Sequence, residues 1–266
     1  MNSQAIPLGK DLDYPQVLDR ELLKAVPRDS YRELIPDSLS SFEGADVWNC
    51  YEINCLDKNG IPRTFWLEFS LPQNTPAIPE SKSLKLYLGS MFGHKFQSKA
   101  ELVQEIESSI EKVCGGKPDY INLIEPSNWS SLLQSDRNTT SIDSLVSSDS
   151  KEINCSPEKV SEILTYHSFR AVCPVTSQPD FASVVVSYSG TKISPNSLAS
   201  YFFSQRLNSG FHEYWSEKIF NDISKAGEFG SLKVQLFFAR RGGIAINPYR
   251  QTPGFYLSIP SPTFNR

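Results

Sequence analysis

A thiol and a carboxylate stand close together in the segment from Cys173 to Asp180, a polar stretch that also holds Pro174 and Pro179. Each proline fixes its own backbone angle and biases the preceding residue toward extended geometry, so the segment is stiffer than its loop-like composition implies. A thiolate is a nucleophile, but an unperturbed thiol with a pKa of ~8.5 is mostly protonated at neutral pH and needs a base or cation nearby. Asp180 can relay protons, and His212 can raise the reactive fraction. A buried structural cysteine beside a turn aspartate is the alternative that these residues leave open.

A second group of polar side chains opens a stretch with helical spacing at Phe211-His212-Glu213. Adjacent residues on a helix are ~100° apart, so His212 and Glu213 can both line one edge of a cleft while Phe211 and Trp215 pack inward. A carboxylate can accept two N–H donors at once, which suits recognition of the hydrogen-bonding edge of a ring. The alternative is a solvated helix face.

Two further stretches have the residue types of phosphate sites. In the segment from Glu80 to Tyr87, Lys82 and Lys85 stand beside the hydroxyls of Ser81 and Ser83, and such groups are suitable phosphate donors. An exposed strand or turn with ordinary lysines is the alternative.

In the stretch Arg240-Arg241-Gly242-Gly243, the arginines can bind phosphate bidentately and the glycines permit close backbone approach to a ligand. A basic hairpin turn is equally compatible with these residues. Because no GxGxxG fingerprint or P-loop is present, any nucleotide must bind without a Rossmann unit.

Composition and cysteine usage narrow the class of protein. The 266 residues are 39% hydrophobic and 21% charged, which is typical of a globular protein. The net charge of -4 argues against a broad basic surface for nucleic acid. Five cysteines without a CxxC pair fit neither a disulfide framework nor a zinc ribbon, so we expect reduced thiols, no metal and a cytoplasmic location. No stretch approaches the ~20 apolar residues that span a bilayer, so no membrane partner is expected.

The first half of the chain predicts strands followed by a helix and a closing strand. Residues 47–53 and 64–71 alternate like strands around an Asn59-Gly60 hairpin turn, and residues 120–124 form a short strand. Between them, Ser98 and Glu101 have the spacing of a capping box before a helix that ends at Gly115.

The second half repeats this order. Residues 181–188 predict a strand that Gly190 can turn back, and helices run from Ser197 with a break near residues 208–210. Residues 232–238 and 244–246 predict paired strands. This order predicts two copies of a small α+β module, each an antiparallel sheet with helices on one face.

The predicted domain boundaries follow composition. Residues 1–43 form an N-terminal extension, residues 44–126 a first module, residues 127–157 a polar linker or surface excursion, and residues 158–266 a second module.

Taken together, the four stretches resemble the NADPH-dependent 7-cyano-7-deazaguanine reductases, the nitrile reductases of queuosine biosynthesis, in their two-module form. The resemblance runs from about Gly44 to Arg250, and the Glu80 motif stands before the cysteine loop as in that form. It implies tandem tunnelling-fold (T-fold) modules whose sheets close into a barrel in a homodimer, a small 7-deazaguanine substrate, NADPH as cofactor and no direct contact with nucleic acid.

The resemblance also implies residue roles. Cys173 would be the nucleophile and Asp180 the proton donor, with His212 also in the catalytic group. The other roles fall into two sets: the deazaguanine would contact Glu80, Ser81, Lys82, His212 and Glu213, and NADPH would be held by Lys82, Ser83, Arg241 and Gly242.

The chemistry implied is reduction of a nitrile to a primary amine through a thioimide formed by Cys173. A thioimide carbon accepts hydride better than a nitrile carbon once its nitrogen is protonated, and an imine intermediate must be sheltered from water. Cys50 and Asp57 repeat the interval of Cys173 and Asp180, but no Phe-His-Glu follows them and Cys50 falls inside an expected strand.

Two other functions stay open. A zinc-dependent hydrolase of the same fold, such as the GTP cyclohydrolases, is disfavoured because only three histidines are present and none belongs to a Cys/His cluster. A non-catalytic purine- or RNA-binding module would make the cysteine structural.

Overall fold

The computed structural model of this chain describes residues 17–35, 41–125, 139–145 and 151–255. Parts of the predicted N-terminal extension (1–16 and 36–40) and of the predicted linker (127–138 and 146–150) lie outside the described residues.

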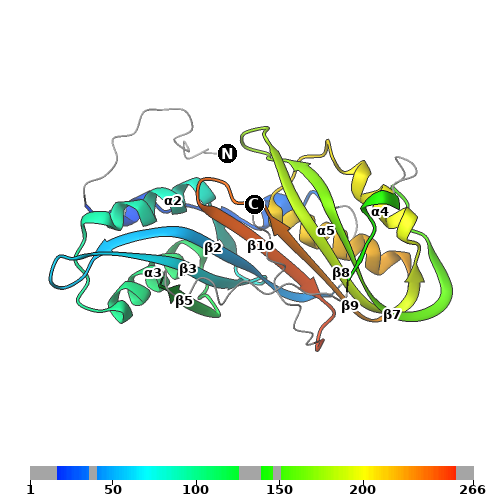
Figure 1. Cartoon of the computed structure of the whole chain (residues 1–266), viewed down its shortest axis with the longest axis horizontal. Helices are drawn as coiled ribbons and strands as arrows, with labels where there is room; N and C mark the ends of the chain where they lie inside the picture. The colour runs from blue at the N-terminus through cyan, green and yellow to red at the C-terminus, as the bar shows by residue number, and fades with distance from the viewer. Residues whose placement is uncertain (1–16, 36–40, 126–138, 146–150, 256–266) are drawn as a thin grey trace.

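Eight strands form one continuous sheet that runs through both halves of the chain (Figure 1). The strand order is β5-β3-β2-β10-β9-β8-β7-β6, and every neighbouring pair is antiparallel except β6 and β7. The bounds are β2 Glu43–Leu56, β3 Pro62–Pro72, β5 Tyr120–Ile124, β6 Thr140–Ser141, β7 Cys155–Val172, β8 Pro179–Ile193, β9 Phe229–Phe238 and β10 Ile244–Gln251. The expected α+β class with antiparallel strands is confirmed.

The pairing of β2 with β10 joins the two halves, and the register runs from Glu43↔Gln251 to Cys50↔Ile244. We expected a separate sheet in each half, so this shared sheet is a difference from the sequence prediction. An unpaired strand edge exposes backbone N–H and C=O groups, and pairing the two inner edges satisfies both. Two short strands, β1 Ala25–Pro27 and β4 Ala77–Pro79, pair with each other outside the main sheet.

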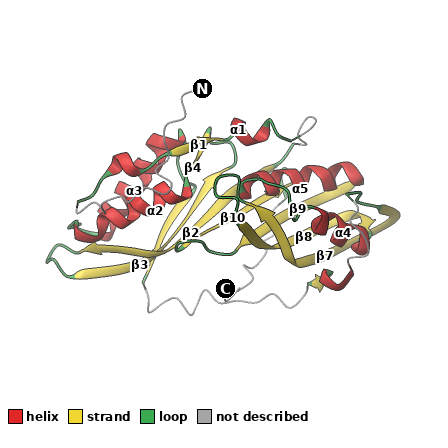
Figure 2. Ribbon diagram, turned by 90° about the horizontal axis from the view of Figure 1, so that it is seen from above, coloured by secondary structure: helices red, strands yellow, loops and turns green. Residues whose placement is uncertain are grey.

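The helices cover each half of the sheet (Figure 2). Figure 2 shows α2 and α3 over the first half, α5 along the second half, and α1, β1 and β4 between them. The helical bounds are α1 Asp29–Arg32, α2 Ser81–Gly89, α3 Lys99–Cys114, α4 Pro195–Ser204 and α5 His212–Ala226, with short 3-10 turns at η1 Arg20–Leu22, η2 Ser90–Gly93 and η4 Asp143–Leu145.

Local sequence signals explain several element boundaries. The Ser98 hydroxyl accepts the Glu101 N–H at 3.1 Å and Gly115 ends α3 with φ 73°, which confirms the predicted N-cap and glycine stop. The Glu101 carboxylate accepts the Gln97 N–H in place of the Ser98 N–H that a capping box would use. The predicted hairpin is also present, with a φ of 80° at Gly60.

Gly190 does not turn its strand back as predicted, because β8 continues to Ile193. At Gly190 the carbonyl oxygen of Glu228 would lie 2.4 Å from an added Cβ. The glycine therefore permits close approach of the neighbouring chain at a register shift between β8 and β9, rather than a turn.

Several elements are absent from the sequence predictions. The long strand β7 begins within the predicted linker, α2 occupies the expected lysine stretch, and α1 and β1 lie in the N-terminal extension. Within the same linker, Ile142 is fully buried and β6 pairs with β7. The described part of that segment therefore packs against the second half.

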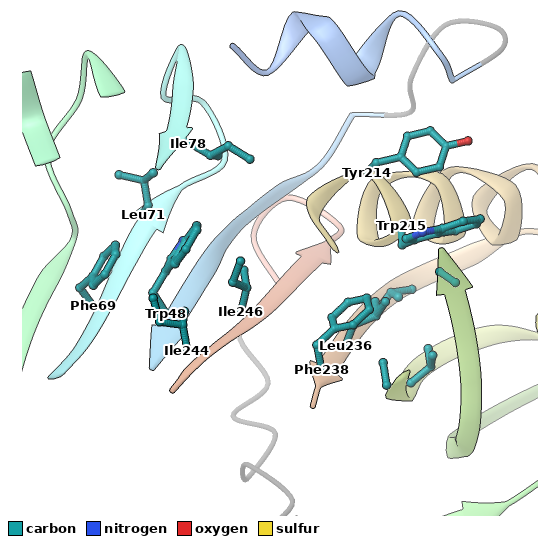
Figure 3. Close-up of a cluster of buried hydrophobic side chains, with 14 of the residues drawn as sticks. Trp48, Phe69, Leu71, Ile78, Tyr214, Trp215, Leu236, Phe238, Ile244 and Ile246 are labelled. Atoms are coloured by element: carbon teal, nitrogen blue, oxygen red, sulfur yellow. The ribbon is translucent and has the colours of Figure 1, made fainter. Parts of the chain in front are cut away.

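The core fills the space between the sheet and its helices (Figure 3). Figure 3 shows Trp48, Ile244 and Ile246 side by side on β2 and β10, and Trp215 on the strand-facing side of α5. Trp48 and Trp215 have no exposed surface, so the core continues across the junction of the two halves. None of the described helices is long and apolar enough to cross a membrane.

Candidate active site

A cavity of about 590 Å³ lies where four segments meet: the start of α2, the β7–β8 loop, the start of α5 and the β9–β10 turn. Nine of the predicted site residues line it: Glu80, Ser81, Lys82, Cys173, Asp180, His212, Glu213, Arg241 and Gly242. The fold therefore gathers groups from both halves of the chain around one space.

The β7–β8 loop fixes the thiol relative to the carboxylate. The Cys173 N–H donates to the Gln178 carbonyl at 2.8 Å, and the Ser177 N–H donates to the Cys173 carbonyl at 3.0 Å. Ser177 has φ 55°, in the left-handed region that is sparsely populated by residues other than glycine. Asp180 is held on β8 by its pairing with Ala171 of β7. The loop, which its prolines predict to be stiff, is thus closed by hydrogen bonds within its own backbone.

Cys50 has a different environment. It is 2% exposed within β2, and burial raises the pKa of its thiol. Asp57 lies beyond the end of β2, where its carboxylate accepts the N–H groups of Asn59 and Ile61 in the hairpin turn. This geometry favours Cys173 over Cys50 as the reactive thiol.

The Asp180 carboxylate is 5% exposed and faces two cationic or potentially cationic groups. Arg241 Nη1 lies 2.9 Å from Asp180 Oδ1, and His212 Nε2 lies 3.7 Å from the same oxygen. The His212 ring stacks on Phe238, with the ring centroids 3.7 Å apart. Arg241 also donates to the side chain of Gln178 at 2.9 Å, so it reaches across the cysteine loop.

Glu213 is buried at the start of α5, where it is 1% exposed. Burial and, next, the nearby Asp46 charge raise the pKa of its carboxyl to about 8, against the opposite effect of Arg28 and Arg250. The carboxyl is therefore protonated at neutral pH until a partner stabilises its charge.

Three buried polar atoms on cavity-lining residues have no hydrogen-bond partner within the described parts of the chain. They are Trp48 Nε1, His212 Nδ1 and Glu213 Oε1. Leaving such an atom unsatisfied costs ~1–3 kcal/mol, so a planar ligand with N–H donors and acceptors would stabilise this cavity. Trp48 was missed by the sequence analysis, because alternation within a strand does not distinguish a core tryptophan from one that lines a site.

The start of α2 differs from the phosphate cradle that the sequence suggested. Glu80 is the N-cap residue, and its carboxylate accepts the N–H groups of Lys82 at 3.0 Å and Ser83 at 2.7 Å. Ser83 is not among the cavity-lining residues, because its hydroxyl bonds to the backbone of Lys24. These bonds anchor the start of α2, and the contact of Ser83 with NADPH stays a prediction.

Cationic groups line the side of the cavity that faces the β9–β10 turn. Lys82, Lys85 and Arg241 line the cavity, and Gly242, with φ 58°, lies beside the Lys85 ammonium. An adjoining cavity of about 390 Å³ shares Lys85 and Gly242. This donor set suits an extended anionic ligand such as a phosphorylated dinucleotide. The described residues contain no group of three or more His, Cys, Asp or Glu side chains arranged to hold a metal ion.

Comparison with known proteins gives two family matches. Residues 14–120 match the family described as nitrile reductase, 7-cyano-7-deazaguanine-reductase N-term, and residues 179–254 match the family described as QueF-like protein. Curated relatives named NADPH-dependent 7-cyano-7-deazaguanine reductase include those of Bordetella pertussis, 35% identical over 258 residues, and Burkholderia ambifaria, 36% identical over 259 residues. In both, the alignment covers 94% of this chain and 94% of the relative.

This chain belongs to the 7-cyano-7-deazaguanine reductase family. The family resemblance inferred from the motifs is thereby confirmed. The first matched segment contains the Glu80 motif, and the second contains Asp180, His212 and Arg241. Cys173 lies between the two matched segments, so the case for this residue in the family's chemistry comes from the geometry of its loop.

Proposed function

We propose that this protein catalyses the NADPH-dependent reduction of the nitrile of 7-cyano-7-deazaguanine to 7-aminomethyl-7-deazaguanine, a step of queuosine tRNA modification. The relatives at 35–36% identity carry the name of this activity. The observation that carries the proposal is the single cavity in which a thiol, a carboxylate, unsatisfied ring-recognition groups and cations meet.

The deazaguanine binds between the α2 and α5 walls of the cavity. Glu213 accepts N–H donors of the pyrimidine ring as a carboxylate, and His212 and Trp48 supply further polar contacts. Ser81 and Lys82 contribute from the opposite wall, and Glu80 orders that wall by capping α2.

Cys173 and Asp180 perform the covalent chemistry. Asp180 takes the proton of the Cys173 thiol, the sulfur forms a bond to the nitrile carbon as one C–N π bond breaks, and Asp180 passes the proton to the nitrile nitrogen, which gives a thioimide. After the first reduction the carbon–sulfur bond breaks, and the thiolate leaves a bound imine that the second reduction converts to the amine. Asp180, which contacts Arg241 and His212, thus relays a proton from the sulfur to the nitrogen.

The residues that would hold NADPH are Lys82, Arg241 and Gly242, with Lys85 beside them and Ser83 anchoring the start of α2. When bound, NADPH supplies one hydride for each of the two reductions. Lysine and arginine side chains suit a 2′-phosphate, and the positive φ of Gly242 permits close approach of its backbone.

The finer architecture also belongs to the proposal. Tandem tunnelling-fold modules that pair in a homodimer are supported by the outer edge of β5, which has no strand partner among the described residues and so can pair with another copy. The cytoplasmic location and the lack of direct nucleic-acid contact rest on cysteine usage and net charge.

The stoichiometry of cofactor consumption tests the proposed reaction. Two NADPH should be oxidised for each 7-cyano-7-deazaguanine converted, with the amine identified by mass spectrometry. Oxidation of a single NADPH per product, or no turnover with a protein that binds both ligands, would exclude reduction to the amine.

A further inference from the structure

Residues 23–35, here called the N-terminal brace, contact both walls of the cavity although the proposed chemistry gives them no role. On the α2 wall, β1 pairs with β4 directly before Glu80, and Val26 lines the cavity. The Glu80 N–H donates to the Lys24 carbonyl at 2.9 Å, and the Lys24 N–H donates to Ser83 Oγ at 2.9 Å. The brace therefore fixes the capping residue and the first turn of α2.

The same segment continues to the α5 wall. Tyr31 is 1% exposed, and its ring centroid lies 6.2 Å from that of Phe211, which precedes α5. Arg32 binds Glu217 through two contacts, Nε to Oε2 at 2.9 Å and Nη2 to Oε1 at 2.8 Å. Glu217 is fully buried one helical turn after Glu213, so the Arg32 contact holds the part of α5 that presents Glu213.

Glu217, which binds Arg32, also takes part in a set of buried ion pairs in the core. Arg250 Nη2 also binds Glu217 Oε1 at 2.8 Å, and Arg250 Nη1 binds Asp46 at 2.9 Å. Asp46 in turn binds Arg28 of the brace at 2.7 Å. Among the described residues, the ion pairs of Arg28, Arg32 and Arg250 are with Asp46 and Glu217, and these five side chains sum to a charge of +1 (3 − 2).

When it is ionised, the buried carboxyl group of Glu213 can balance this excess charge. Its Oε1 atom has no hydrogen-bond partner within the described parts of the chain, so no contact at that atom holds its orientation in the absence of ligand. The position of Glu213 is set by α5, and α5 is held through Glu217 by Arg32 and Arg250. Loosening Arg32 should therefore affect the ligand that Glu213 recognises.

We infer that the N-terminal brace is a structural part of the ligand site, and that Arg32 is a positioning residue that holds Glu213 through Glu217. The inference rests on the proposed role of Glu213 in binding the deazaguanine. It gives the N-terminal extension a function in substrate recognition.

The test compares two arginines of the N-terminal region that make similar bidentate pairs. Arg20 binds Glu105 of α3 at 2.6 and 2.7 Å but lines no part of the cavity. We expect Arg32→Gln to raise the dissociation constant for 7-cyano-7-deazaguanine about tenfold, equivalent to about 1.4 kcal/mol, while Arg20→Gln changes it less than about twofold. The KM for NADPH should stay within about twofold in both variants, and Arg32→Lys should restore part of the loss.

A double-mutant cycle separates positioning from a general loss of stability. In a Glu213→Gln background, adding Arg32→Gln should change the dissociation constant less than about twofold, because the residue through which Arg32 acts is already altered. An additive effect, or an Arg32→Gln affinity equal to that of Arg20→Gln, would overturn the inference.

Two further measurements cover the cases in which Arg32→Gln does not fold or the site itself does not bind the ligand. If Arg32→Gln does not fold, Tyr31→Phe replaces it, since it removes only the hydroxyl that accepts from Arg28 at 2.8 Å, and we expect about threefold weaker binding. Unchanged binding by Tyr31→Phe would then count against the brace. If the wild type binds no 7-cyano-7-deazaguanine, or Glu213→Gln binds as well as the wild type, the proposed function of the site fails first.

Discussion

Cys173 and Asp180 stand at opposite ends of one hairpin loop, and the neighbouring residues give each a distinct environment. The thiol is half-buried in a loop closed by its own backbone bonds, whereas Asp180 is buried between Arg241 and His212. A nucleophile and a proton donor that must act on adjacent atoms of one nitrile need such fixed geometry. The sequence predicted that these two side chains act together, and the structure places both at the same cavity.

Glu213 should make ligand binding depend on pH. Its pKa of about 8 in the empty protein means that below this pH the carboxyl must lose a proton to accept N–H donors as a carboxylate. The affinity for 7-cyano-7-deazaguanine should therefore fall by up to about tenfold per pH unit below pH 8 and level off above it. Calorimetric titration between pH 6 and 9 measures this slope, and Glu213→Gln should flatten it.

The raised pKa of Glu213 also makes the free energy of unfolding depend on pH. Because the folded-state pKa of Glu213 is raised from 4.5 to about 8, its contribution favours the folded protein most below the unfolded value and is lost as the pH rises through 8.

A wild-type affinity for 7-cyano-7-deazaguanine that does not change between pH 6 and 9, or an equal slope in Glu213→Gln, would contradict the assignment of Glu213 to ligand binding.

The residue types alone did not predict the local contacts of the lysine stretch. The lysine stretch has the composition of a phosphate site, yet Glu80 uses its carboxylate to cap α2 and Ser83 turns its hydroxyl to Lys24. Glu80 falls three positions before Ser83, which is the spacing of a cap, but no apolar periodicity of sufficient length follows to predict the helix. By contrast, α3 carries the spacing of a capping box, a regular apolar stripe and a terminal glycine, so its bounds were predicted within one residue.

The two N-caps offer a matched comparison at the level of elements. Glu80→Ala and Ser98→Ala each remove a side chain that caps a helix, so each should lower the free energy of unfolding by ~1 kcal/mol. Only Glu80→Ala should also weaken the binding of 7-cyano-7-deazaguanine, by about tenfold or more, because only α2 lines the cavity. Urea denaturation and ligand titration of both variants check this, and equal ligand affinity in the two would argue against the role of α2.

The whole molecule is organised around a junction that no sequence pattern predicts. The strands β2 and β10 lie about 200 residues apart in the chain, yet their pairing makes one sheet and brings Glu80 and Glu213 to the same cavity. Non-local pairing of this kind depends on which strand edges remain free after each half has formed, and that information is not local. The sequence predicted two α+β halves, and it could not predict that the halves share a sheet or that residues 23–35 bind to both.

The buried ion pairs at this junction should have a measurable effect on global stability. Asp46 binds both Arg28 and Arg250, and all three side chains are fully buried. Asp46→Asn leaves two buried arginines without their shared anion and should lower the free energy of unfolding by ~3–5 kcal/mol. Chemical denaturation measures the change.

The exposed pair between Glu158 and Lys192 provides the control for this prediction. Its atoms lie 2.9 Å apart but both side chains face solvent, so Glu158→Gln should cost less than ~1 kcal/mol. Similar losses in the two variants would show that the junction does not depend on the Asp46 network.

The central claim is that the Cys173 sulfur bonds transiently to the nitrile carbon, and mass spectrometry of the intact protein tests it most directly. Wild-type protein mixed with 7-cyano-7-deazaguanine in the absence of NADPH should gain the mass of one ligand. Cys50→Ala should gain the same mass, because the Cys50 thiol is buried within β2. Folded Cys173→Ala should gain none; an adduct in that variant, or unmodified wild type at saturating ligand, would contradict the account.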